Sequence, residues 1–145
     1  MTTFKDLDPI ETDFGIPFIP VGWLEKDSVF ETGPVSQEFF TKLEALVVHP
    51  WQPFHRLGVH FCELCQFDPP GFNAEVYIPF EGKLYMAPVG IKHYIAAHWY
   101  RPPQIFIEAV LACPPMRSMA YHKSLLENGA RPLIKALANP PQMKP

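Results

Sequence analysis

Proline is the residue that most limits what this chain can fold into. Eighteen of the 145 residues are prolines, more than twice the usual share, and they recur along the whole sequence. Because proline lacks a backbone N–H and fixes its own φ, it ends helices and stays out of the middle of sheets. The sequence therefore predicts short helices and strands separated by many turns.

Length and composition predict one folded domain spanning residues 1–145. Hydrophobic residues make up 48% of the chain, with 12 Phe, 5 Tyr and 3 Trp, which excludes the disordered class. No apolar run is long enough to cross a membrane, and the N-terminus lacks the features of a secretory signal. Three cysteines are typical of a reducing compartment. We expect a cytoplasmic protein with no disulfide and no membrane contact.

Charge is distributed unevenly along the chain. The net charge is -3, yet the first 50 residues hold 3 Lys and Arg against 9 Asp and Glu, whereas the last 45 hold 6 against 2. We expect the acidic end to pack against the basic end of the same chain, the alternative being an acidic partner for the C-terminal third. A pI near 6.0 and scattered Arg and Lys argue against nucleic-acid binding.

The N-terminal third divides into two parts. Residues 1–35 combine many apolar side chains with four prolines, so we expect an extended segment wrapped over the core, with a short strand or two. A helix should begin after Ser36, a natural N-cap, and apolar residues recur at helical spacing until His49 and Pro50 stop it.

The rest of the chain alternates strand-like and helical patterns. We expect a strand at 55–61, a cysteine knuckle at 62–65, a loop at 68–71, a hairpin of 74–78 and 83–86 joined through Glu81 and Gly82, a helix from Pro88 to about His98, and helices near 105–111, 118–127 and 133–137. This is an α+β fold, with a small antiparallel hairpin or sheet and a zinc knuckle of the treble-clef type packed against several short helices.

Two cysteines and two histidines form the one constellation that indicates chemistry. Cys62 and Cys65 have C-x2-C spacing, which lets both thiolates approach one ion from a tight knuckle, and His93 and His98 follow on the predicted helix. We therefore predict one structural zinc ion, Zn2+, with these four ligands. The histidines are five residues apart, about 140° around a regular helix, so the helix end near Trp99 must unwind for both to reach the metal.

Several alternatives remain open for these residues. The cysteines could be ordinary core residues, and His60, or less readily His55, could replace His98 as a ligand. If Cys62, Cys65 and one histidine were the only protein ligands, the open position would suit a metal-dependent hydrolase. Cys113 lies on an apolar helix face and reads as a structural thiol.

The run from His98 to Pro103 contains Trp99, Tyr100 and Arg101, residue types that dominate protein interfaces. The competing interpretation, which we favour, is a corner between two helices whose aromatic side chains pack inward.

Four stretches carry a resemblance to a family of small bacterial proteins of unknown function. They are His60-x-Cys62-x2-Cys65, Tyr85-x-Ala87-Pro88, His93-Tyr94-Ile95-x2-His98-x-Tyr100-x-Pro102-Pro103 and Ala109-Val110-Leu111-x-Cys113-Pro114. The similarity spans residues 55–125 and implies that Cys62, Cys65, His93 and His98 act as a set, without implying an activity.

The sequence thus predicts a structural zinc protein that serves as a protein-binding or regulatory module and is not itself an enzyme. Small acidic domains of this size include immunity proteins that cap a toxin, which makes another protein the expected partner. The rival is the hydrolase with a catalytic zinc, and the number of protein ligands at the metal separates the two.

Overall fold

A computed structural model of the chain describes residues 4–54 and 59–138. The central sheet has three strands in the order β1-β5-β4, where β1 is Phe18–Pro20, β4 is Glu75–Phe80 and β5 is Lys83–Pro88. The strands β4 and β5 form an antiparallel hairpin, and β1 runs parallel to β5 with Phe18 opposite Leu84. A second, two-stranded sheet pairs β2 (His60–Phe61) with β3 (Gly71–Phe72).

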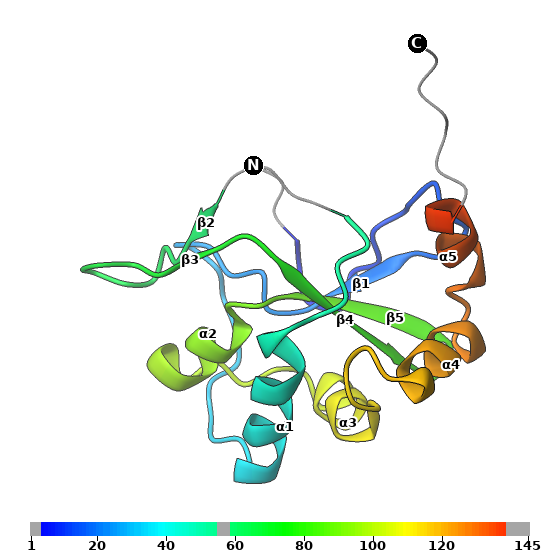
Figure 1. Ribbon diagram of the computed structural model, residues 1–145. Helices are drawn as coiled ribbons and strands as arrows, with labels where there is room; N and C mark the ends of the chain where they lie inside the picture. The colour runs from blue at the N-terminus through cyan, green and yellow to red at the C-terminus, as the bar shows by residue number, and fades with distance from the viewer. Residues whose placement is uncertain (1–3, 55–58, 139–145) are drawn as a thin grey trace.

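Five helices complete the described residues, and the fold is α+β as predicted. They are α1 (Gln37–Val48), α2 (Ile91–His98), α3 (Gln104–Ala112), α4 (Met119–Glu127) and α5 (Arg131–Ala138). Figure 1 shows α1 to α4 gathered on one side of the central sheet, with α1 against α3 and both against β4. The predicted short elements are confirmed, since the longest helix has 12 residues.

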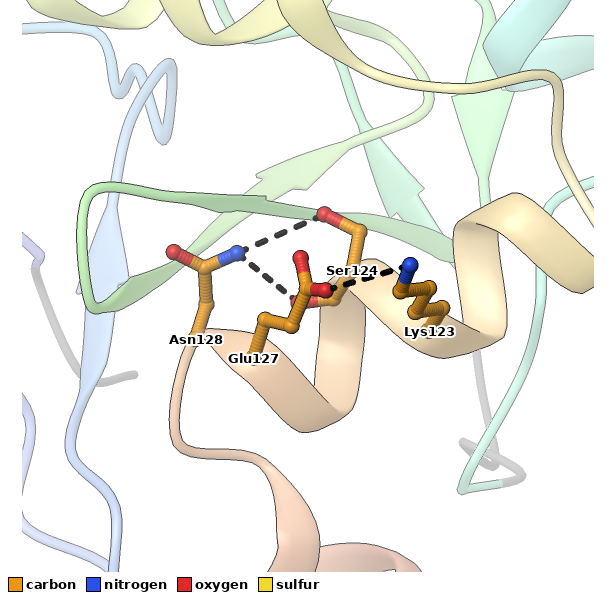
Figure 2. Close-up of polar contacts among 4 residues, drawn as sticks. All are labelled: Lys123, Ser124, Glu127 and Asn128. Atoms are coloured by element: carbon orange, nitrogen blue, oxygen red, sulfur yellow. Dashed lines mark hydrogen bonds and ion pairs between the residues drawn. The ribbon is translucent and has the colours of Figure 1, made fainter.

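Side-chain caps fix the helix boundaries that the sequence predicted. The hydroxyl of Ser36 accepts a hydrogen bond from the N–H of Phe39, and that of Ser118 accepts one from Tyr121. At the other end of α4, the side-chain amide of Asn128 donates to Ser124, as Figure 2 shows beside the exposed ion pair of Lys123 and Glu127. The side-chain oxygen of Asn128 also accepts from the N–H of Gly82, which ties α4 to the hairpin turn.

The hairpin turn is confirmed, but its second strand extends further than the sequence indicated. Glu81 and Gly82 have φ values of 49° and 76°, the left-handed pair that a tight two-residue turn requires. Pro88, predicted to begin a helix, instead ends β5 opposite Glu75. A proline is tolerated there because the pairing of β1 with β5 ends at Met86, so no ladder bond is lost on that side.

Two other predictions for the middle of the chain need correction. Of the predicted strand at 55–61, His60–Phe61 is a strand and Val59 is not, while residues 55–58 lie outside the described part of the chain. The predicted loop at 68–71 ends earlier, because Gly71 pairs with Phe61 in the small sheet. Val59 and Phe61 cover Gly71, where a β-carbon would collide with the side chain of Val59. A glycine is needed for the two strands to meet beneath these side chains.

The N-terminal segment contributes directly to the core. Phe18 is buried and packs edge-on against Tyr77 of β4, while Leu24 and Val21 are also buried. Between described residues no ion pair joins the acidic first 50 residues to the basic last 45, in contrast to the expected electrostatic packing. The contact combines apolar packing, with Gly15 lying close to the ring of Pro132 on α5, and hydrogen bonds from the guanidinium groups of Arg101 and Arg117 to backbone carbonyls of the first 50 residues.

Candidate metal centre

The four predicted ligands come from two neighbouring parts of the fold. Cys62 follows β2 directly, and its N–H donates to the carbonyl of Pro70 at 3.0 Å, which closes the loop that carries Cys65. His93 lies in the first turn of α2, and His98 is the last residue of the same helix. Figure 1 shows the β2–β3 ribbon above α2, with its connecting loop extending away from the body of the molecule.

The side chains of these residues converge. Nε2 of His93 lies 3.2 Å from Sγ of Cys65, and Nε2 of His98 lies 3.4 Å from Sγ of Cys65 and 3.5 Å from Sγ of Cys62. One ligand atom from each residue can be chosen so that all four lie within 4.8 Å of one another. In a tetrahedral zinc site, bond lengths of about 2.3 Å to sulfur and 2.0 Å to nitrogen put S and N about 3.5 Å apart. The cluster therefore has the size that a metal ion needs.

The end of α2, which carries His98, departs from regular helical hydrogen bonding. Trp99 adopts a left-handed conformation (φ 60°, ψ 19°), and its N–H donates to the carbonyl of Tyr94, five residues back, rather than four. The N–H of Tyr100 donates to the same carbonyl at 3.2 Å. The last turn is thus wider than a regular one, and the ring centroids of His93 and His98 lie 5.1 Å apart. The predicted loosening is present, although it begins only at Trp99.

The ribbon rests on α2 through one aromatic ring. Phe72 of β3 lies 6.1 Å from the ring of His93 and 6.0 Å from that of Tyr94, measured between centroids. Gly90, just before α2, lets this ring approach the backbone, because a β-carbon there would overlap three ring atoms. Sequence reasoning missed both residues. The glycine next to a helix start was the available signal, but its neighbour in space could not be read from the chain.

Burial and mutual repulsion shape the protonation of the cluster. Burial raises the pKa of the Cys65 thiol, and the neighbouring Cys62 raises it further. Burial also lowers the pKa of His93, and the positive charge of a protonated His98 acts in the same direction. Neutral imidazole is the form that binds metals, and a bound dication would stabilise the thiolates that otherwise repel each other. Without a cation, burial and the neighbouring Cys62 favour the neutral thiol of Cys65.

Tyr94 is on α2, next to His93 in the sequence. Its side chain is fully buried, and within the described residues its hydroxyl is the one buried side-chain polar atom without a hydrogen-bond partner. Burial raises its pKa, and the nearby Cys62 and Glu63 add to the effect. The hydroxyl remains protonated and is therefore available as a hydrogen-bond donor.

The other candidate residues lie elsewhere. His60 is not part of the group of four, and His55 falls outside the described residues. Cys113 is buried at the end of α3, where burial raises the pKa of its thiol to about 12, so it is not a reactive nucleophile.

The aromatic residues after His98 do not share one orientation. Tyr100 packs inward as predicted, edge-on against Phe30, and its hydroxyl donates to the carboxylate of Asp6. Trp99 was also expected to pack inward, but 61% of it is exposed. The left-handed backbone at Trp99 gives this side chain a different direction from that of its neighbour.

Comparison with known proteins gives one result. No curated protein and no solved structure matches the chain. Across the described residues no helix has the length and apolar character of a membrane span. A family model for a domain of unknown function, DUF7919, matches residues 2–111, a range that includes all four cluster residues. The chain therefore belongs to the DUF7919 family, as the resemblance to a family of unknown function had predicted.

Proposed function

We propose that Cys62, Cys65, His93 and His98 bind one structural zinc ion, and that the zinc-held end of the molecule is a docking surface for another protein. The observation that carries the proposal is the placement of exposed aromatic residues. Phe61, Phe67 and Trp99 are 55%, 78% and 61% exposed, and each is within two residues of a proposed ligand. Phe and Trp are among the residue types enriched at protein interfaces.

A structural role suits the ligand set better than a catalytic one. Two thiolates and two imidazoles fill a tetrahedron and leave no position for a reactive water. The hydrolase alternative requires one histidine to stay away from the metal, but both imidazoles lie within 3.5 Å of a cysteine sulfur. The distances therefore favour four protein ligands and a closed site.

The ribbon also needs the stabilisation that a metal provides. The strands β2 and β3 have two residues each, and a ribbon of that length is not stable by itself. Within its loop, residues 62–70, Cys62 is the one buried residue. A zinc ion that joins the loop to α2 would couple metal binding to the folding of this region.

The charge of the ribbon indicates the chemistry of the partner. Residues 59–72 contain Glu63 and Asp68 but no Lys or Arg, and a zinc ion with two thiolates and two neutral imidazoles adds no net charge. An acidic ribbon with exposed aromatic side chains complements a protein surface that presents Lys or Arg around an apolar centre. The negative charge of the ribbon does not favour contact with the phosphate backbone of nucleic acid. Binding and inhibiting a toxin, as immunity proteins do, is one function of this kind.

Metal analysis of the purified protein tests the first half of the proposal. We expect about one zinc per chain, and loss of both zinc and stability in Cys62→Ser, Cys65→Ser and His93→Ala. The matched control is His60→Ala, which should retain the metal because His60 is not in the cluster. Protein that is free of metal and melts as before after treatment with a chelator would refute the structural role. Exchanged phenotypes for His60 and His93 would move the ligand to β2.

Site-specific photo-crosslinking in the native host tests the second half. A benzoylphenylalanine at position 67 should capture a protein through a segment rich in Lys or Arg, whereas the same group in place of Met119, which is 84% exposed on α4, should not. With the purified partner, Phe61→Ser and Trp99→Ser should weaken binding by at least about tenfold each. Equal affinity of these variants and of Met119→Ser for the partner would contradict the docking surface.

A further inference from the structure

We propose that a cavity between the C-terminal end of α1 and the loop from α3 to α4 binds a small organic phosphate monoester. The cavity is an open surface pocket with a volume of about 310 Å³, since Ala45, His49, Pro115 and Arg117 in its lining are exposed, and it contains none of the four residues of the metal cluster. This volume is at the lower end of the range for small-molecule sites, roughly 300–1,000 Å³. The proposal does not depend on the function proposed for the metal centre.

The lining of the cavity combines an apolar wall with positive charge. Ala45, Leu46 and Met116 contribute apolar surface, while Lys42, His49 and Arg117 contribute cationic or hydrogen-bond-donating side chains. None of the lining residues is acidic. A ligand for such a site has one end that carries negative charge and one small apolar group.

Arg117 is held in place before any ligand arrives. Its Nε donates to the carbonyl of His49 at 3.2 Å, and its Nη2 donates to the carbonyl of Pro50 at 2.9 Å. These carbonyls lie just beyond the C-terminal end of α1, where the helix dipole places a partial negative charge. That charge would repel an anion, and the guanidinium of Arg117 offsets it. A guanidinium has five N–H donors, and these two bonds leave Nη1 and one N–H of Nη2 available.

The backbone at Arg117 is consistent with a specialised position. Its φ is 65°, in the left-handed region that a residue with a β-carbon adopts only at some cost in energy. The next residue, Ser118, is the N-cap of α4, so the positive end of that helix dipole begins beside the cavity. Arg117, the residue with the strained backbone, thus presents its cationic side chain at the cavity.

No carboxylate neutralises these cations. Within residues 4–54 and 59–138, the one ion pair is Lys123 with Glu127, and neither Lys42 nor Arg117 is paired with an acidic side chain. The last 45 residues have an excess of positive charge, 6 Lys and Arg against 2 Asp and Glu. Two cations and an imidazole around one cavity match the charge of a phosphate dianion better than that of a single carboxylate.

Binding of phenyl phosphate, followed by amide chemical shifts of the labelled protein, tests the proposal. We expect saturable binding at or below about 1 mM, with shifts centred on Lys42 and residues 115–117, and weaker binding of inorganic phosphate, benzoate and phenol. Lys42→Gln should weaken binding by at least about fivefold, and Arg117→Gln should do the same. The matched control is Lys123→Gln on α4, which is outside the cavity.

Because Arg117 also anchors the end of α1, the Lys42 variant provides the independent measurement if Arg117→Gln is poorly folded. No saturable shift at 10 mM phenyl phosphate would overturn the proposal. Equal binding of phenol, or stronger binding of benzoate, would overturn the ligand class. Unchanged affinity in Lys42→Gln would show that the cavity does not use the charge on which the argument depends.

Discussion

Replacing Gly90 with alanine should destabilise the protein by about 1–3 kcal/mol, the usual cost of adding a methyl group to packed side chains. The backbone does not cause this cost, since φ is −71° and ψ is −3° at Gly90, values that alanine adopts readily. The new β-carbon would lie closer than 3.0 Å to three ring atoms of Phe72, whereas non-bonded carbons rest about 3.5–4.0 Å apart. The ring must move by more than about 0.5 Å.

The displacement of the Phe72 ring should also disturb the metal centre. Phe72 packs against His93 and Tyr94, so a displaced ring loosens the ribbon from the helix that carries two proposed ligands. Zinc affinity should therefore fall together with stability, although no ligand has been changed. For a chain of this size, the melting temperature should fall by about 3–10 °C.

A double-mutant cycle separates this clash from other effects of the alanine. Urea unfolding, followed by tryptophan fluorescence in the presence of zinc, gives the free energy of unfolding of the wild type, Gly90→Ala, Phe72→Ala and the double variant. With the ring removed, Gly90→Ala should cost less than about 0.5 kcal/mol, since the methyl group then enters open space. An equal cost in both backgrounds, or no cost in the wild type, would refute the packing of Phe72 on Gly90.

Three further predictions concern other parts of the molecule. Tyr100→Phe removes the hydrogen bond to Asp6 and should lower the free energy of unfolding by about 1 kcal/mol, measured by urea unfolding; an unchanged value would show that this bond does not hold the N-terminal segment. Cys113, whose thiol pKa is about 12, should escape iodoacetamide at pH 8 until the protein unfolds, as peptide mapping can test. Because the unfolded thiol ionises near pH 8.5, its contribution to stability is constant below that pH and is lost as the pH rises toward 12. Deletion of residues 1–35 should expose the apolar core and so cause aggregation; a truncated protein that stays monomeric and melts as before would show this segment to be a separate arm.

Local chemistry made the helix and hairpin boundaries readable from the sequence. Ser36 and Ser118 cap their helices through bonds to residues three positions ahead, which depend on nothing distant in the chain. Glu81 and Gly82 likewise specify their own turn. Pro88 was misread because its tolerance in β5 depends on where β1 stops pairing, and β1 lies more than 60 residues earlier.

The metal cluster was predicted from residue types, and its geometry needed the fold. The C-x2-C spacing and the two histidines can be recognised from the sequence without a structure. The five-residue spacing is compatible with one ion in the folded chain, where both imidazoles lie within 3.5 Å of a cysteine sulfur at the end of α2 that Trp99 closes in a left-handed conformation. That same turn decides that Trp99 is exposed while Tyr100 is buried.

The sequence by itself therefore determined the short elements, the α+β class and the four residues of the candidate site, because caps, turns, prolines and ligand spacings act over a few residues. Tertiary structure alone decided that β1 joins the hairpin in parallel, that Phe72 sits over Gly90 and that Arg117 is fixed beside Lys42. These contacts join segments far apart in the chain, and they depend on how whole surfaces pack, a property that no local pattern encodes.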